Sequence, residues 1–365
     1  MVTLHFVDDN AQAWQLFTEN PATWEAMLLA CAKATRSIDC EQFIFEADDI
    51  GRQFIDLFVR KARSGVAVRL LCDAAGSYGF MGSKHVRQLK GAGVQVLFYN
   101  PFFAWRARNT SSLLLRDHRK ILLVDSRVGI TGGTAIASRM KGWRDTNIQI
   151  EGPAILEMER SFEVMWQISS HHPFAQFPKN KRSGEQFSVL NNSPRLQRRE
   201  IYHALLNATK MAREYVYLAT PYFVPSLRLH RALLRAARRG VDVRLMVPVS
   251  SDFRIVDMAG RSFFSHLLKA GVAIYQYQGP LLHAKTAVAD DTWAMVGSAN
   301  LDNLSLLLNY EMSVASGDTA FVAAMKAQFI KDTVSCVQID YNIWKKRGVI
   351  AKLQEYLARS LRLWL

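Results

Sequence analysis

The sequence has few cysteines, and they are scattered. Its 365 residues include four, with no close pair and no Cys-x-x-Cys: Cys31, Cys40, Cys72 and Cys336. Disulfide frameworks and zinc sites need cysteines at short, regular spacings. We therefore expect four reduced and mostly buried thiols, as is usual in an intracellular protein.

Long apolar runs are also lacking. A membrane-spanning helix needs roughly 18 consecutive apolar residues, and no uninterrupted run approaches that length. The first residues, MVTLHFVDDNAQ, have neither the basic start nor the apolar stretch of a secretory signal. The sequence thus predicts no signal peptide and no spanning helix, so that any contact with a membrane would be made at its surface.

Acidic residues are outnumbered by basic ones. Asp and Glu total 32 against 46 for Lys and Arg, which gives a formal charge of +14. Such an excess favours a polyanionic partner, either nucleic acid or an anionic membrane surface. A hydrophobic content of 49% with 21% charged residues is that of a folded globular protein and excludes a disordered chain.

Strand and helix patterns occur twice in the same order. Three pairs of segments correspond: 37–48 with 215–225, 54–74 with 229–249, and 89–101 with 267–280. Gly65 and Gly240, 175 residues apart, both stand where a helix should end before a buried strand. That period is far longer than a solenoid repeat, and it indicates gene duplication.

The repeat predicts the architecture. Alternating strands and helices imply β-α-β crossovers, and hence a sheet sandwiched by helices in each half. We predict an α/β fold of two similar α/β/α sandwich halves, related by pseudo-twofold symmetry, with the active site between them. The expected division is a first half at 1–175, a linker region rich in basic, Asn, Ser and Pro residues at 176–200, a second half at 201–342 and a C-terminal helix at 343–365.

Each half contains one copy of the motif His-x-Lys-x-x-x-x-Asp. Its residues are His118, Lys120 and Asp125 in the first half, and His283, Lys285 and Asp290 in the second. A histidine and a lysine two positions apart on a strand point to the same face. The aspartate closes each strand at a turn, where capping explains it at least as well as catalysis does.

Two further features follow each motif. The first is a turn of small residues whose backbone N–H groups could hold an anion, at Gly132–Thr134 (including Gly133) and at Gly297–Asn300 (including Ser298). The second is a carboxylate: Asp145 lies 27 residues after the first histidine, and Glu311 lies 28 after the second. Either carboxylate could bond one ring nitrogen and fix the tautomer, which leaves the other nitrogen free to react.

Two His-Lys pairs brought together by symmetry suit a phosphodiester substrate. The two lysines would neutralise the non-bridging oxygens, so that no metal or other cofactor is required. One neutral imidazole would attack phosphorus, and the other, protonated, would give its proton to the leaving alcohol. A phosphohistidine formed in this way allows the enzyme to choose its acceptor.

At these residues the sequence resembles the phospholipase D superfamily, whose hallmark is two copies of this motif. The resemblance covers nearly the whole chain and is closest to bacterial cardiolipin synthases of the short type without N-terminal transmembrane helices. The segments that carry it are FEADDIGRQF (45–54), GVAVRLLCDAAGS (65–77), WRDTNIQIEGPA (143–154), TPYFVPS (220–226) and GSANLDNLSLLLNYE (297–311).

The resemblance implies the phospholipase D fold and transfer of a phosphatidyl group from phosphatidylglycerol to an alcohol on a second phospholipid, with release of glycerol. It implies a peripheral protein on the cytoplasmic face of the bacterial inner membrane. His118 takes the place of the nucleophile and His283 that of the acid/base. Asn300 matches a phosphate-contacting asparagine, whereas Ala135 stands where its first-half counterpart should be, and Asp252 lines the acceptor side.

Three other functions use part of the same pattern. A phospholipase D would employ the same residues with water as the acceptor, and only the acceptor pocket distinguishes it. A nuclease of the superfamily would also suit the charge, but should have aromatic and basic residues along a groove. A non-enzymatic scaffold at the membrane is disfavoured because both motifs are intact.

Two segments suggest contact with lipid. The first half has 13 extra residues before its histidine, within 100–117, where Phe102, Phe103 and Trp105 are interleaved with Arg106, Arg108 and Arg116. Such residues suit a headgroup interface, although packing of the loop on its own domain explains them equally well.

The second segment is the C-terminus. An apolar stripe at helical spacing is formed by Ile350, Leu353, Leu357, Leu361 and Trp364, and a separate polar face by Lys352, Glu355, Arg359 and Arg362. Such a helix lies in the headgroup plane of an anionic bilayer. The alternative is a terminal helix whose stripe packs on the protein's own core.

Overall fold

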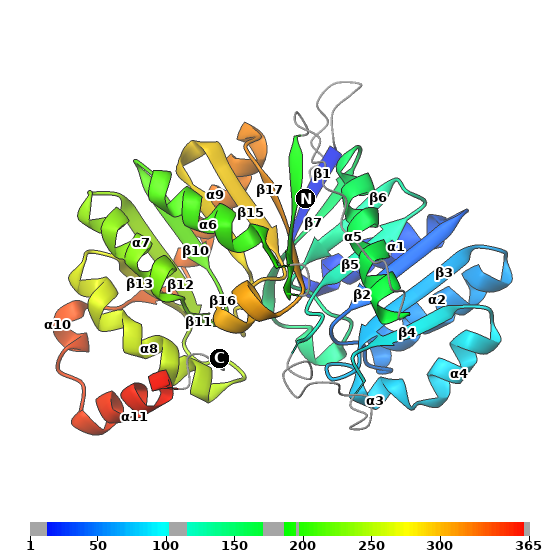
Figure 1. Ribbon diagram of the computed structural model, residues 1–365, viewed down its shortest axis with the longest axis horizontal. Coiled ribbons are helices and arrows are strands. Elements are labelled where there is room, and N and C mark those ends of the chain that lie inside the picture. Colours follow the sequence, from blue (N-terminus) through cyan, green and yellow to red (C-terminus); the bar gives the residue numbers. More distant parts are fainter. Residues whose placement is uncertain (1–12, 102–114, 171–185, 195–196, 361–365) are drawn as a thin grey trace.

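The computed structural model describes residues 13–101, 115–170, 186–194 and 197–360, which form two mixed sheets with helices on both sides (Figure 1). The first half contains β1 (Ala13–Glu19), α1 (Asn20–Lys33), β2 (Ser37–Gln42), α2 (Asp49–Arg63), β3 (Ala67–Asp73), α3 (Tyr78–Met81), α4 (Lys84–Gly91), β4 (Gln95–Tyr99), β5 (Lys120–Val124), β6 (Val128–Gly132), β7 (Arg144–Glu151) and α5 (Ala154–Ser169).

The second half repeats these elements. It contains β8 (Phe187–Ser193), β9 (Arg198–Arg199), α6 (Glu200–Met211), β10 (Tyr215–Ala219), β11 (Phe223–Val224), α7 (Leu227–Arg238), β12 (Asp242–Pro248), α8 (Arg254–Lys269), β13 (Ala273–Tyr277), β14 (Thr286–Ala289), β15 (Trp293–Gly297), β16 (Leu301–Asp302), β17 (Glu311–Ser316), α9 (Thr319–Thr333), β18 (Cys336–Gln338), α10 (Tyr341–Trp344) and α11 (Val349–Ser360).

The strand order confirms the predicted duplication. The first sheet runs β1-β7-β6-β5-β2-β3-β4, and the second contains the same succession as β8-β17-β15-β14-β10-β12-β13, with β9 and β18 added at its edges. In each half three parallel strands are joined by helical crossovers, and the remaining strands pair antiparallel. Gly65 and Gly240 end their helices at φ of +91° and +92°, a conformation that costs glycine little.

The two halves share a central core. Helices α5 and α9 lie between the sheets, where Phe162 and Phe321 belong to one apolar cluster that includes Ile148 of the first sheet and Val314 of the second. Separate clusters fill the outer layers, under α1, α2 and α4 in the first half and under α6, α7 and α8 in the second. The shared core fixes the halves against each other, which positions residues of both at one interface.

The second half begins inside the segment expected as a linker. Strand β8 pairs with β17 from Phe187 to Asn192. The end of β8 is polar, so the sequence pattern does not indicate a strand there. These side chains are nevertheless buried, because they hydrogen-bond to other segments of the second half: Asn192 donates to two carbonyls of the segment at 305–306. The linker region of the sequence is therefore in part a strand of the second sheet.

The C-terminal helix packs on the protein through Glu355 and Ala358. Glu355 is buried and accepts hydrogen bonds from Arg347 at 3.0 and 2.6 Å, and the helix lies against α8. The described part of the apolar stripe faces solvent instead: Ile350 is 75% exposed, Leu353 56% and Leu357 58%. The stripe at these positions therefore does not pack on the core. The side chains of Lys352 and Arg359, together with Leu361, Arg362 and Trp364, lie outside the described residues.

Other sequence expectations have mixed outcomes. The four cysteines are free, three of them buried and Cys336 half-buried. None of the described helices is long and apolar enough to span a bilayer. Most of the aromatic insertion, including Phe102, Phe103, Trp105, Arg106 and Arg108, lies outside the described residues, whereas Arg116 is half-buried and pairs with Asp73 at 3.3 Å, a structural role in place of an interfacial one.

Candidate active site

Each motif histidine is held by the backbone of the opposite half. The His118 amide donates to the carbonyl of Tyr310 at 3.0 Å, and the His283 amide donates to the carbonyl of Arg144 at 2.7 Å. These bonds belong to two short parallel bridges, one at each end of the pseudo-twofold arrangement. The interface between the halves is therefore built around the two histidines.

The carboxylates predicted to orient the rings are also exchanged between the halves. His118 Nδ1 lies 2.9 Å from Oε1 of Glu311, and His283 Nδ1 lies 2.7 Å from Oδ2 of Asp145. All four side chains are buried or nearly so. Because Nδ1 is engaged in each ring, Nε2 is the nitrogen left for chemistry.

The two lysines are buried beside the histidines. Lys120 Nζ donates to the carbonyl of His118 at 2.6 Å, and Lys285 Nζ donates in the same way to His283. Burial, with mutual repulsion, lowers the pKa of Lys120 to about 7, although Glu311 opposes the shift. Burial likewise lowers the pKa of Lys285 to about 8 against the attraction of Asp145.

Burial keeps both rings neutral in the free protein. It lowers the pKa of His118 well below the ordinary value, and Lys120 and Lys285 add to the effect. It lowers the pKa of His283 to about 4, with Lys285 acting in the same direction and Asp145 against it. A neutral imidazole is the nucleophilic form, so that either ring could attack a bound electrophile.

The two orienting carboxyls differ in their ionisation. Burial raises the pKa of Glu311 to about 8, despite the attraction of Lys120 and a hydrogen bond from Ser298. Burial also acts on Asp145, but His283, Lys285 and an amide hydrogen bond outweigh it and lower that pKa. An ionised Asp145 stabilises positive charge on His283, whereas a largely neutral Glu311 gives His118 no such support.

The histidines open onto one cavity between the halves. It has a volume of about 380 Å³ and a mostly apolar lining that includes several polar side chains. Aromatic rings flank both histidines: Phe43 meets His118 edge-on at 4.8 Å between centroids, and Trp143 lies 5.1 Å from His283. A cavity of this size and character suits an amphiphilic molecule.

The small residues after each motif make room for carboxylates. A Cβ on Gly133 would lie 2.2 Å from Oδ1 of Asp145, and Ser298 at the matching place donates its hydroxyl to Glu311. Their amides donate to carbonyls of the neighbouring strand, Gly133 to Thr146 and Ser298 to Met312. The amides of Gly133 and Ser298 are therefore satisfied by the neighbouring strands and are not free to hold an anion.

The motif aspartates lie away from the cavity. Asp125 accepts hydrogen bonds from the amides of Thr35, Arg36 and Ser37 at 2.7 to 2.8 Å, which fixes the chain as it enters β2. Asp290 does the same for the chain entering β10, at 2.9 to 3.0 Å. The structure thus favours the capping role over the catalytic one.

We therefore predict that Asp125→Ala and Asp290→Ala affect stability more than chemistry. Each should lower the free energy of unfolding by about 1–3 kcal/mol, since several amides lose their acceptor. Urea denaturation measures this loss, with Asp56→Ala, an exposed change on α2, as the control expected within about 0.5 kcal/mol. A loss of specific activity beyond tenfold in the folded variants would show that these residues take part in catalysis.

The remaining expected residues lie at the cavity. Asn300 and Asp252 line it, as does Ala135 at the position that matches Asn300. The sequence did not single out Trp143, Tyr222 or Asp302, which also line the cavity, although all three fall within the segments that carry the family resemblance.

Arg144 is a further residue that sequence reasoning missed. Its carbonyl holds the His283 amide, and its guanidinium pairs with Asp332 of α9 at 2.5 Å. The position of Arg144 directly before Asp145 is the feature of the sequence that could have indicated its role.

Comparison with known proteins identifies the family. A family model described as "Cardiolipin synthase, PLD-like domain" matches residues 28–166 and 205–333. The chain belongs to this cardiolipin synthase family. It is 31% identical to a cardiolipin synthase of Clostridium perfringens, over 98% of this chain and 79% of that protein, and 31% identical to cardiolipin synthase 1 of Bacillus cereus, over 95% and 71%.

Solved structures confirm the fold. The phosphatidylserine synthase of Haemophilus influenzae superposes with a TM-score of 0.78 over 100% of this chain and 97% of that one, at 11% identity. A polyphosphate kinase of Porphyromonas gingivalis gives 0.61 over 94% of this chain and 52% of the other, at 13% identity. The predicted fold class is thereby confirmed, and the family model and the cardiolipin synthase relatives confirm the family resemblance.

Proposed function

We propose that the protein makes cardiolipin by transferring a phosphatidyl group from one phosphatidylglycerol to a hydroxyl of a second, with release of glycerol. The observation that carries this proposal is the pair of buried histidines, each bonded to a carboxyl of the opposite half, which both line one mostly apolar cavity. Its relatives are named cardiolipin synthases, which gives the reaction class.

The first step forms a phosphohistidine. Nε2 of His118 attacks phosphorus while the bond from phosphorus to the glycerol oxygen breaks, and His283 gives its proton to that oxygen. Lys120 and Lys285 balance the charge of the non-bridging oxygens, and Asn300 contacts the phosphate. The negative phosphodiester and the ionised Asp145 both favour protonation of His283, which supports its role as the acid.

The second step reverses these roles. His283, now neutral, takes the proton of the acceptor hydroxyl, whose oxygen attacks phosphorus. The bond from phosphorus to His118 breaks, so that the free imidazole returns and cardiolipin is complete. Water in place of the lipid alcohol would give phosphatidate, and the apolar lining of the cavity disfavours it.

The proposal is tested by product analysis. Incubation with vesicles of phosphatidylglycerol, followed by mass spectrometry, should show cardiolipin and glycerol in equal amounts. Phosphatidate as the main product would establish a phospholipase D instead. Cleavage of oligonucleotides without any change in lipid would establish a nuclease.

We predict that kcat/KM falls as pH rises through about 7 to 8. Lys120 and Lys285 carry positive charge below their lowered pKa values and lose it above them, so phosphate binding weakens as pH rises. Bound phosphodiester raises both lysine pKa values, and kcat should therefore hold to higher pH than kcat/KM. Initial rates in detergent micelles give both profiles, and a kcat/KM that is level or rising from pH 7 to 9 would contradict the role of the lysines.

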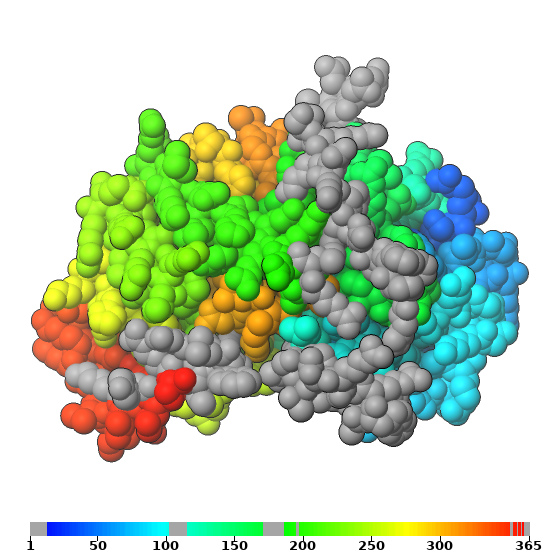
Figure 2. Space-filling model, viewed as in Figure 1, coloured from blue at the N-terminus to red at the C-terminus, as the bar shows by residue number. Residues whose placement is uncertain are grey.

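We also propose that the protein rests on the surface of an anionic membrane through α11. The stripe of Ile350, Leu353 and Leu357 faces solvent, and Lys345 and Lys346 are exposed just before the helix. In Figure 1, α11 lies below α8 at the lower edge of the second half, and Figure 2 shows it in red on that edge. Exposed apolar side chains beside cations suit the headgroup region of anionic lipid.

Charged substitutions in the stripe test this attachment without removing the helix. Leu353→Asp and Leu357→Asp should each reduce sedimentation with phosphatidylglycerol vesicles at least about tenfold, through lost burial and repulsion. Activity on vesicles should fall much more than activity in micelles. Met211→Asp is the matched control, because Met211 is 73% exposed and precedes β10, at the end of the strand away from the cavity. Unchanged sedimentation of both stripe variants would exclude α11 as the attachment.

A further inference from the structure

The two halves contribute different walls to the cavity. The bridge of Phe45 with Ile136 in the first half matches the pairing of Phe223 with Leu301 in the second, which fixes the register of the comparison. At three corresponding positions the second half has a polar residue where the first half has an apolar one. Tyr222 corresponds to Ile44, Asn300 to Ala135, and Asp302 to Ala137. The pseudosymmetry is broken where the substrate binds.

Asp302 is the most buried carboxyl of the polar wall. It is 5% exposed and accepts a hydrogen bond from the Ser305 amide at 2.7 Å, at the start of a π-helical turn, Leu304–Leu308. The side chain of Asn300 also bonds to it. Asn300 is 4% exposed, and its Oδ1 has no hydrogen-bond partner among the described residues. An acceptor is thus buried at the cavity wall without a donor.

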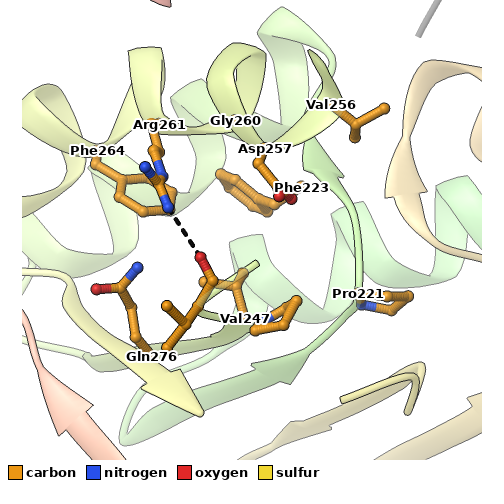
Figure 3. A pocket seen from close by; sticks show the side chains of 11 residues that line it. Pro221, Phe223, Val247, Val256, Asp257, Gly260, Arg261, Phe264 and Gln276 are labelled. Atoms are coloured by element: carbon orange, nitrogen blue, oxygen red, sulfur yellow. Dashed lines mark hydrogen bonds between the residues drawn. The ribbon is translucent and has the colours of Figure 1, made fainter. Parts of the chain in front are cut away.

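A second carboxyl is held beside the first. The hydroxyl of Tyr222 donates to Asp252, and both side chains line the cavity. The loop that carries Asp252 is fixed to α8, because Asp257 accepts from the Ser251 amide at 2.8 Å. Arg261 also donates to the carbonyl of Val249, at 2.8 Å (Figure 3). The pocket in Figure 3 has a volume of about 20 Å³, enough for about one water, and is too small to bind substrate. The residues around it support the wall.

The geometry of the reaction places the alcohol at this wall. In an in-line displacement the leaving oxygen departs on the side of phosphorus away from the nucleophile. With His118 of the first half as nucleophile, the alcohol therefore leaves and enters on the side of His283 and the second half. The charges of Asp252 and Asp302 are among those that act on Lys285, which places both carboxyls near that side.

Resting on the proposed function, we propose that Tyr222, Asp252 and Asp302 form the subsite for the alcohol, and that it selects a hydroxyl next to a second hydroxyl, as in glycerol. The carboxyl oxygens and Asn300 Oδ1 accept hydrogen bonds from the two hydroxyls. A single-hydroxyl alcohol leaves one of these buried acceptors unpaired, which costs more than the lost contact alone.

An ammonium-bearing alcohol fits this subsite less well. Lys285 already stands beside the carboxyls and repels a second cation. Burial raises the pKa of Asp302 to about 7, so its surroundings disfavour a full negative charge that would attract one. The wall therefore suits neutral hydroxyls.

Competition between soluble alcohols tests the subsite. Wild-type protein in micelles of phosphatidylglycerol is offered deuterated glycerol, 1-propanol or ethanolamine, and the phosphatidyl products are measured by mass spectrometry. We expect kcat/KM for glycerol to exceed that for 1-propanol by at least about 100-fold. Asp302→Asn and Tyr222→Phe should each lower this ratio at least tenfold. The ratio does not depend on how much of a variant is folded, and Tyr222→Phe removes only one oxygen.

The outcomes separate the subsite from the reaction. If the wild type transfers to no alcohol, including a second phosphatidylglycerol, the proposed function fails and the subsite with it. If transfer occurs but neither variant changes the ratio, or if the exposed control Asp56→Asn changes it equally, the subsite is wrong while the function stands. A preference for ethanolamine over glycerol would overturn the choice of a neutral polyol.

Discussion

Replacing either His118 or His283 by alanine is expected to lower phosphatidyl transfer by at least about 10⁴-fold. His118 supplies the only proposed bond to phosphorus, and His283 supplies the proton without which glycerol is a very poor leaving group. Both rings open onto the same cavity, and each is held by the other half. Neither half can therefore act alone.

The double variant distinguishes a shared mechanism from two independent sites. Because both residues serve one reaction, His118→Ala combined with His283→Ala should cost no more than about the worse single change. His203→Ala, an exposed histidine on α6, is the control and should keep full activity. Single variants that each keep about half of the activity would show that the halves work separately.

Replacing Asp145 by asparagine should be far more damaging than replacing Glu311 by glutamine. Asp145 is ionised and stabilises protonated His283, so the amide should cost about 10³–10⁴-fold, as expected when a carboxylate behind a catalytic imidazole is lost. The pKa of Glu311 is raised to about 8, so this carboxyl is largely neutral at pH 7. Glutamine can accept from His118 through Oε1, but its amide must donate to the Ser298 hydroxyl in place of accepting from it, and about a tenfold loss is expected.

A donor with a better leaving group separates the two roles further. Phosphatidyl-p-nitrophenol needs no proton on departure, so Asp145→Asn should release nitrophenol nearly as fast as wild type in the first turnover. Glu311→Gln acts on the nucleophile and should show the same small loss with either donor. Equal losses for both carboxyl variants on phosphatidylglycerol would contradict the difference in their ionisation.

The sequence predicts the fold and the reacting groups because the patterns that indicate them occur twice, once in each half. Gly65 and Gly240 mark matching helix ends, and two copies of one motif place His118 and His283 at matching strands. The sequence also indicates the two orienting carboxyls, but not which histidine each of them bonds. Asp145 and Glu311 follow their own histidines at nearly equal distances, and only the packing of the halves shows that each serves the other histidine.

The features missed by sequence reasoning depend on contacts between distant segments. The motif aspartates cap loops about 75 to 90 residues earlier in the chain, which spacing within the motif does not reveal. Strand β8 ends in polar residues that are buried only because they bond across the second half. Glu355 is buried where Arg347, eight residues earlier in the chain, donates two hydrogen bonds to it.

In the proposed mechanism, His118 carries the phosphatidyl group while His283 moves the proton. This assignment is tested most directly by mixing His283→Ala with phosphatidyl-p-nitrophenol, quenching at alkaline pH to preserve phosphohistidine, and mapping the modified peptide by mass spectrometry. We expect one equivalent of nitrophenol and a phosphatidyl group on His118, and neither product from His118→Ala. Modification of His283 in the His118→Ala protein, with His118 unmodified in the other variant, would contradict it.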